Sequence, residues 1–369
     1  MAGGSGKTPT LSDVRCMRSF VRNLIIAGLA VGLLALFLWH AHLAVVWQEI
    51  RHAELGLIAV AIVSMFVNLL VRGVRWQYLL RPVGNTSFGN AVRAIAIGFA
   101  ATTLLPARAG EFLRPYVLAR REGFSATAAF ATVVLERVLD LLAVVLLLAA
   151  FILLFDPGMA RRNGAIYAAV RLGGLMGGVS AIVLLAVMFA FAGRPDAVTR
   201  AVAKLAHVLP ARIAHGVARL AGLFAEGLAV ARNPGHLLLA FGWSVVLWLS
   251  IAVGIWTTTR AFHIAISFPG SFLIIALLVV GAAVPTPGSI GGFHEAFRIV
   301  ATAFYGVPND RAVGAAIVLH AISIIPVTLF GLLCFAREGI NLKSLSSLAS
   351  VAAAEDKPGE VPVLRPSGR

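Results

Sequence analysis

Cysteine is almost absent from this chain of 369 residues. The two that occur, Cys16 and Cys334, lie in the N-terminal tail and in the last apolar run. Two cysteines so far apart exclude a disulfide framework and a thiolate metal site. We therefore expect no metal centre and assign neither thiol a role.

Charge is also scarce, at 13% of the residues, whereas soluble domains carry about 25%. Hydrophobic residues make up 59%, and the mean hydropathy is +0.91. This composition excludes an ordinary soluble enzyme and leaves no polar stretch long enough for a water-soluble catalytic domain. It predicts an all-α polytopic membrane protein.

Acidic residues number 16 against 31 lysines and arginines, which gives a net charge of +15. In a soluble protein this excess would suggest nucleic acid. Here the basic residues flank apolar runs, which predicts cytoplasmic loops over anionic lipid headgroups and no nucleic-acid partner. Residues 194–233 interleave arginine with apolar residues at helical spacing, so we expect a cytoplasmic amphipathic segment there.

Long apolar runs predict about six full transmembrane helices, at residues 24–39, 57–71, 127–155, 173–192, 237–258 and 312–335. The first run can also be interpreted as a cleavable signal peptide. Arg72, Arg75 and Arg81 follow the second run and place that end in the cytoplasm. Residues 159–172 are predicted to form a loop that carries arginines. We expect residues 1–20 and 341–369 to be disordered tails around a membrane domain at 21–340.

Two further apolar runs, 91–105 and 271–284, are too short to span a bilayer. Proline and glycine end both of them, which predicts broken, re-entrant helical hairpins. The helix-breaking residues are Pro106 and Gly110 in the first, and Pro285, Pro287, Gly288, Gly291 and Gly292 in the second. Counting spans brings the hairpins in from opposite sides, so they form an inverted repeat of the kind found in secondary transporters.

Each break is followed by a glutamate and an arginine three residues apart, which can pair on one helical face. Arginines near helix N-termini suit a phosphate, so we predict headgroup binding by Arg108, Glu111, Arg114, Glu295 and Arg298. The alternative is that these residues form structural pairs that seal the broken helices.

Ionisable residues also recur at membrane depth, where they usually mark a pathway. Glu136, Arg137 and Asp140 lie about three turns into their helix, and we expect Arg137 to pair with Asp140. His320 lies at the corresponding depth of the last helix and can titrate near neutral pH. We predict a translocation pathway along these four residues; a buried structural network is the alternative.

Four motifs resemble the lysylphosphatidylglycerol synthase transmembrane family, also called the flippase-like domain family, over about residues 22–336. They are RWQYLL at 75–80, P-x3-G-E-x2-R at 106–114, LERVLD at 135–140 and PTPGSIGGFHE at 285–295. The resemblance implies movement of aminoacylated phospholipid between leaflets of the bacterial inner membrane. We expect a stand-alone member, since no cytosolic transferase domain of the kind attached in some relatives follows Phe335 in this sequence. The sequence also differs in having Ser289 where relatives more often have glycine, and His320 where many have arginine.

We therefore expect a flippase-like protein that moves an anionic or amino-modified polar lipid (phospholipid, isoprenoid or hopanoid). No P-loop, catalytic constellation or cofactor motif is present in the sequence, so we do not expect an enzyme or a cofactor. Two alternatives stay open: an intramembrane lipid-modifying transferase using Glu136 and Asp140, and an accessory subunit of a separate lipid-biosynthesis enzyme. Both termini are expected in the cytoplasm.

Overall fold

The computed structural model describes residues 28, 31–39, 41–104, 110–155, 164–194, 200, 220–284 and 286–337, and all regular structure in these residues is helical. The principal elements are α2 (Leu43–Arg51), α3 (Leu55–Leu80), α4 (Phe88–Leu104), α5 (Gly110–Glu122), α6 (Ala126–Ala150), α7 (Gly164–Gly193), α10 (Pro234–Ala261), α11 (Gly270–Ala283), α12 (Gly292–Ile299) and α13 (Asn309–Arg337). A π-helical turn, Phe151–Phe155, extends α6, and another, Val300–Phe304, follows α12.

Five of these helices are long and apolar enough to cross a membrane: α3, α6 with its extension, α7, α10 and α13. A bent pair, Val31–Leu38 and Leu43–Arg51, makes a sixth span if its two parts are counted as one. This confirms the predicted all-α polytopic membrane protein. α4 and α11 are apolar but shorter, as expected for interrupted segments.

Two expected boundaries were wrong. α3 continues to Leu80 instead of ending at residue 71, and Arg72 and Arg75 are buried within it instead of flanking the membrane. The apolar run stops at the first arginine, but the helix does not, because carboxylates on another helix offset the arginine charge. α7 begins at Gly164, so the described part of the expected 159–172 loop is helical and Arg171 lies inside the helix.

The two predicted tails and most of the predicted amphipathic segment at 194–233 lie outside the described residues. The final part of that segment packs into the bundle. Val230 and Ala231 are buried, and the Arg232 guanidinium donates a hydrogen bond to the carbonyl of Ala192 at the end of α7. This part of the segment is therefore an element of the protein core and not a lipid-facing surface.

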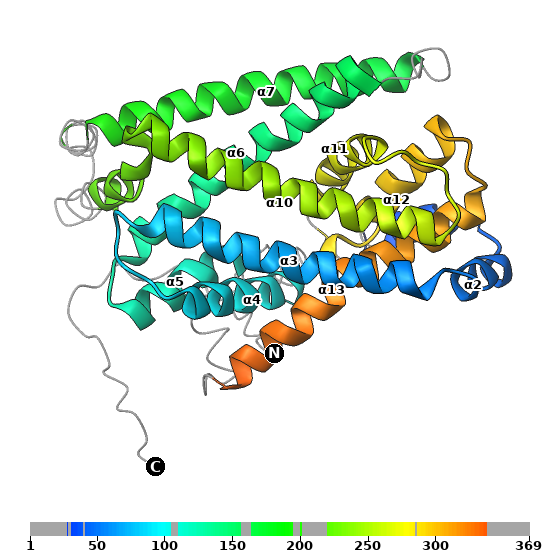
Figure 1. Ribbon diagram of the computed structural model, residues 1–369, viewed down its shortest axis with the longest axis horizontal. Coiled ribbons are helices and arrows are strands. Elements are labelled where there is room, and N and C mark those ends of the chain that lie inside the picture. The colour runs from blue at the N-terminus through cyan, green and yellow to red at the C-terminus, as the bar shows by residue number, and fades with distance from the viewer. Residues whose placement is uncertain are drawn as a thin grey trace, which may run out of the picture.

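The scaffold of the fold is an antiparallel pair, α3 and α10, which run side by side through the centre of the molecule (Figure 1). At one end, the Tyr78 ring lies 5.7 Å from the ring of His236. At the other, the Glu54 N–H donates to the Ala261 carbonyl at 3.0 Å. The end of α3 and the start of α10 therefore share one end of the pair.

Each helix of this pair leads directly into one of the two hairpins. Hairpin 1, α4 and α5, follows α3 at Leu80, whereas hairpin 2, α11 and α12, follows α10 at Ala261. Because α3 and α10 are antiparallel, the hairpins enter from opposite ends of the scaffold, as Figure 1 shows. The predicted inverted repeat is confirmed.

The two legs of each hairpin touch through a pair of glycines. A Cβ on Gly110 would collide with the Gly98 carbonyl, and a Cβ on Gly292 would collide with the Gly281 carbonyl. In both hairpins one glycine lies in the leg before the break and the other is the first residue of the leg after it. The equivalent contacts show that the two hairpins are built in the same way.

The tips of both hairpins reach α13. Near the break of hairpin 1, the Thr328 hydroxyl lies 3.4 Å from that of Thr103. In hairpin 2, the break carries Gly288, Ser289 and Gly291 in left-handed backbone conformations, and His320 Nε2 donates to the Gly288 carbonyl at 2.8 Å. A Cβ at Gly288 would be in van der Waals contact with Thr103, so the two tips approach each other.

The open end of hairpin 1 is closed by Glu122, which lies beyond the apolar spans. Its Oε1 accepts hydrogen bonds from Thr86 Oγ1 at 2.7 Å, Asn90 Nδ2 at 2.8 Å and the Ser87 N–H at 3.3 Å. Desolvation opposes ionisation of this carboxyl, but the hydrogen bonds outweigh it and lower the pKa of Glu122 below its usual value. The carboxylate therefore ties the end of α5 to the start of α4.

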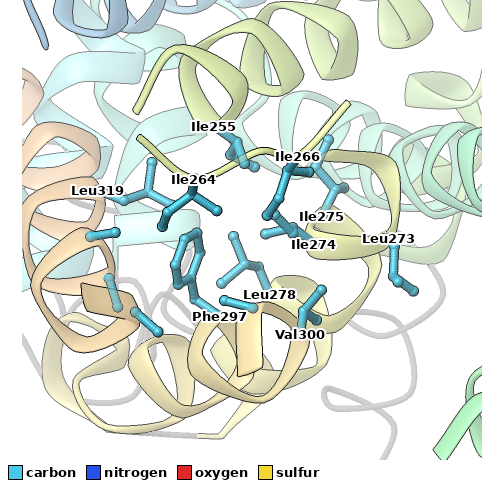
Figure 2. Packing of buried hydrophobic residues seen from close by; sticks show 14 of the residues in the cluster. Ile255, Ile264, Ile266, Leu273, Ile274, Ile275, Leu278, Phe297, Val300 and Leu319 are labelled. Atoms are coloured by element: carbon cyan, nitrogen blue, oxygen red, sulfur yellow. The ribbon is translucent and has the colours of Figure 1, made fainter. Parts of the chain in front are cut away.

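Hairpin 2 is held by an apolar core (Figure 2). Phe297 of α12 is fully buried between side chains of α10, α11 and α13 and of the segment that joins α10 to α11. Figure 2 shows the surrounding side chains, among them Ile255, Ile264, Leu278 and Leu319. Burial of apolar side chains therefore positions this hairpin.

Replacing Gly281 with alanine should destabilise the protein, because the added Cβ would push against the backbone of Gly292. Overpacking of this kind costs about 1–3 kcal/mol. Gly242→Ala on α10 is the matched control, since nothing lies within 4 Å of its added Cβ. Thermal unfolding of both variants in detergent checks this. An unchanged melting temperature for Gly281→Ala would contradict the close contact between α11 and α12.

Candidate functional site

A cluster of charged side chains is buried where α3, α5 and α6 meet. Arg72 and Arg75 come from α3, Arg114 comes from α5, and Glu136 and Asp140 come from α6; none is more than 7% exposed. Arg72 and Arg75 are three residues apart and Glu136 and Asp140 are four apart, so each pair lies on one helical face. The cluster joins hairpin 1 to the scaffold.

Arg75 lies at the centre of the cluster and binds both carboxylates. Its Nη1 lies 2.5 Å from Asp140 Oδ1 and 2.7 Å from the Ser244 hydroxyl, while its Nη2 lies 3.0 Å from Glu136 Oε1. Asp140 also accepts a hydrogen bond from Trp248 Nε1 at 3.2 Å. Buried charges need such partners, since an isolated ion in apolar surroundings is very costly.

Arg114 binds the other oxygen of the same glutamate. Its Nη2 forms an ion pair with Glu136 Oε2, and its guanidinium lies over the Trp76 ring at 4.1 Å from the centroid. The base of its side chain packs against Gly98 in the first leg of the hairpin. Glu136 therefore bridges α3 and hairpin 1.

Positive charge is in excess in this region. Arg137 lies 3.9 Å from Asp140 with 44% of its side chain exposed, and Arg72 makes no ion pair with any described carboxylate. With Arg75 and Arg114, four guanidinium groups thus face two carboxylates, an excess of two positive charges. A region of this kind suits an anionic ligand.

Hairpin 2 contains a separate ion pair. Arg298 Nη2 lies 2.5 Å from Glu295 Oε1, Arg298 Nε lies 2.8 Å from Oε2, and Arg298 Nη1 donates to Asn309 Oδ1 at 3.2 Å. The predicted pairing within this motif is confirmed. The charges of Glu295 and Arg298 neutralise each other, and the hydrogen bond from Arg298 to Asn309 links α12 to the start of α13.

Two histidines face each other at the break of hairpin 2. The rings of His294 and His320 lie 4.4 Å apart between centroids. His320 donates to the Gly288 carbonyl, and His294 Nδ1 accepts from the Gly291 N–H at 3.3 Å. Both imidazoles therefore stabilise the interrupted backbone that follows α11.

The structure divides the predicted site residues into two groups. Arg114, predicted to bind headgroups, is brought together with Glu136, Arg137 and Asp140 of the predicted pathway, whereas Glu295, Arg298 and His320 lie around hairpin 2. Glu111 is in the first turn of α5. Arg108, Pro106 and Pro285 lie outside the described residues. The functional roles of all these residues stay predictions.

The sequence does not reveal the side chains of α3 and α10 that bind the carboxylates of α6 or the arginines that pair with them. Asp140 pairs with Arg137 as predicted, but Arg75 binds it more closely. In the sequence, Arg72 and Arg75 follow an apolar run and so have the pattern of loop charges, and Ser244, Trp248 and Asn68 belong to no recognisable motif. The three- and four-residue spacings place the arginines on one face of α3 and the carboxylates on one face of α6, but they do not show that these two faces meet.

Replacing Glu136 with glutamine should destabilise the protein strongly, because Arg75 and Arg114 would lose a shared carboxylate while remaining buried. Breaking a buried pair in this way costs about 3–5 kcal/mol. Glu49→Gln, at the partly exposed Glu49–Arg311 pair, is the control and should have a small effect. The measurement is thermal unfolding in detergent, and similar effects of the two variants would contradict a structural role for Glu136.

Comparisons with known proteins show short matches to two relatives and a long match to one family. Two curated relatives each match 126 residues, or 33% of this chain. Glycosyltransferase AglD of Haloferax volcanii is 34% identical over a fifth of its own length (20%), and the UPF0104 membrane protein PH1989 of Pyrococcus horikoshii is 30% identical over 37% of its length. The matched segment thus spans well under half of either relative.

The family match is much longer than either of these. Residues 23–331, which include both hairpins and the buried cluster, match the family described as lysylphosphatidylglycerol synthase TM region. This range includes every motif on which the resemblance was based. The chain is a multi-pass membrane protein that belongs to the lysylphosphatidylglycerol synthase TM region family.

Proposed function

We propose that this protein is a lipid translocase, which moves an anionic or amino-modified polar lipid between the leaflets of a bacterial inner membrane. The observation that carries the proposal is the pair of hairpins that enter from opposite ends of the α3–α10 scaffold and meet on α13. Interrupted helices in an inverted repeat, meeting within the membrane, are the basis of alternating access in secondary transporters.

The chemistry of the meeting point supports this proposal. Interrupted backbone is tolerated inside a membrane only where protein or water satisfies its polar groups. Here Thr103, Thr328 and His320 lie beside the interrupted backbone. A polar headgroup needs a route of this kind, while its acyl chains can stay in the surrounding lipid.

The family and the buried charges support a lipid with a charged headgroup. Membership in a family named for lysylphosphatidylglycerol synthase supports a role in membrane lipid chemistry. The excess of guanidinium groups favours a phosphate-bearing headgroup, because the guanidinium fork matches phosphate oxygens. Both carboxylates of the cluster are held by arginine, which favours a carrier over an acid–base enzyme.

A second function is favoured by one comparison. The relative from Haloferax volcanii is named a glycosyltransferase, although this chain matches only a fifth of it. On that basis the chain would be a lipid-modifying transferase or the membrane subunit of a separate lipid-modifying enzyme. A new lipid species, detected by mass spectrometry after incubation with lipid and an activated sugar donor, would support this alternative.

The translocase is tested in liposomes that contain fluorescent short-chain phospholipid, with dithionite quenching of the outer leaflet. Purified protein should accelerate exchange above the rate of protein-free vesicles. A double variant, Thr103→Cys with Thr328→Cys in a background lacking Cys16 and Cys334, should lose this activity on oxidation and regain it on reduction. The reason is that a disulfide would fix the tip of hairpin 1 to α13.

The single-cysteine variants serve as controls for the disulfide experiment and should keep their activity under oxidising conditions. The translocase proposal would be wrong if anionic, zwitterionic and amino-modified lipids all exchanged no faster than in protein-free vesicles. Activity that survives complete crosslinking would instead show that the hairpin tips do not move during transport.

The orientation that we propose places the loop between α3 and α4 in the cytoplasm and the loop before α13 outside. Asn85→Cys and Pro308→Cys, both at exposed positions in the same cysteine-free background, test it. In intact cells an impermeant maleimide should label Pro308→Cys but not Asn85→Cys, and both should react after lysis. Labelling of both in intact cells would contradict the inverted arrangement across the membrane.

A further inference from the structure

Arg72 is the buried arginine of the cluster that has no carboxylate of its own. Its Nε donates to Asn68 Oδ1 at 3.0 Å, and its guanidinium lies over the Phe99 ring at 5.3 Å from the centroid. The Asn68 side chain is fixed in turn by the Leu247 carbonyl and the Ser250 hydroxyl. Among the described residues no acceptor binds the two terminal amino groups of Arg72, although the residue is only 7% exposed.

The charges around Arg72 do not neutralise it. Asp140 and Glu136 are within electrostatic range, but they already bind Arg75 and Arg114. Arg75 and Arg137 are also within range and add positive charge. An uncompensated guanidinium inside apolar helices is costly, and an anion that accepts its hydrogen bonds would remove that cost.

The position of Arg72 connects this site with the lipid. Arg72 lies eight residues before Leu80, or about 12 Å along the helix, inside the end of α3. Phe99, which flanks the guanidinium, is 37% exposed, so the site borders the outer surface of the described helices. A bound phosphate would lie below the end of α3, with an aromatic ring beside it for the first part of an acyl chain.

We propose that Arg72 of α3, together with Arg137 of α6, binds the phosphate of an anionic phospholipid headgroup. This inference rests on the proposed function and changes its site. The arginines of the hairpin motifs, Arg114 and Arg298, already have carboxylate partners. The terminal amino groups of Arg72 bind no acceptor among the described residues, so they are available to a ligand. Two arginines from different helices would hold one phosphate through several charge-assisted hydrogen bonds.

Calorimetric titration of the full-length protein in a neutral detergent tests the site. The probes are dioctanoyl phosphatidylglycerol, dioctanoylglycerol, which has the same chains without phosphate, and sn-glycerol 3-phosphate, which has the phosphate without chains. We expect phosphatidylglycerol to bind most tightly. Equal binding of dioctanoylglycerol would overturn the phosphate contact, and equal binding of glycerol phosphate would overturn the lipid as its source.

Arg72→Gln should weaken phosphatidylglycerol binding about tenfold or more, which is the range of a lost charge-assisted hydrogen bond. Arg72→Lys keeps the charge but loses the fork, so it should fall between Arg72→Gln and the unaltered protein. Arg81→Gln is the matched control, because it removes one positive charge from the exposed end of α3. An equal loss with Arg81→Gln, or no loss with Arg72→Gln, would overturn the proposal.

If the variants at the buried Arg72 do not fold, Arg137→Gln is used to test the site instead. Its side chain is 44% exposed, so the substitution should be tolerated and should still weaken binding. The outcome is independent of the transport assay. Arginine-dependent binding without exchange in liposomes would keep the site and remove the translocase, whereas exchange that is unaffected by Arg72→Gln and Arg137→Gln would do the reverse.

Discussion

The ion pairs between α3 and α6 are the constraint on which the rest of the structure depends. Arg75 is fully buried, and its charge is tolerable only because Glu136 and Asp140 approach it from the neighbouring helix. This pairing fixes the rotation and the depth of α6 against the scaffold. Glu136 then binds Arg114 as well, so the same contact positions hairpin 1.

The two hairpins share a backbone design but are held in place by different chemistry. Hairpin 1 packs through an apolar cluster of α4, α5 and α13, and buried charge adds to this through Arg114 in the cluster and Glu122 at its open end. Hairpin 2 is fixed by an apolar core around Phe297, and its ion pair is local. Because the buried cluster includes Arg114, hairpin 1 is the half of the repeat that the proposed anionic headgroup would influence.

The backbone of this fold could be predicted from the sequence because its signals are local. Apolar runs predict the helices, and Gly288, Gly291 and their neighbours predict the break in hairpin 2. Both glycines adopt left-handed backbone conformations there, which explains why the helix is interrupted. Ser289 also adopts a left-handed conformation, in which a glycine would be favoured over serine. Local rules of this kind do not depend on tertiary contacts.

The site could be predicted only in part, because its contacts join distant segments. Arg75 and Asp140 are 65 residues apart, and nothing in the spacing of one helix shows which face of another it will meet. Glu111 and Arg114 have the same spacing as Glu295 and Arg298, yet Arg114 binds Glu136. A closer carboxylate on α6 overrides the local pattern, and only packing decides that.

The place of Arg114 links the charged cluster to the hairpin tip. Arg114 lies about one helical turn after Gly110, the first residue after the break, and the base of its side chain packs against Gly98. An anion bound at Arg72 would add negative charge near Arg75 and Arg137. It would therefore change the electrostatic environment of Glu136 and with it the Glu136–Arg114 ion pair. In a carrier of the proposed kind, headgroup arrival at the cluster would therefore act on the first hairpin through a single turn of α5, whereas the second hairpin would stay fixed by its apolar core.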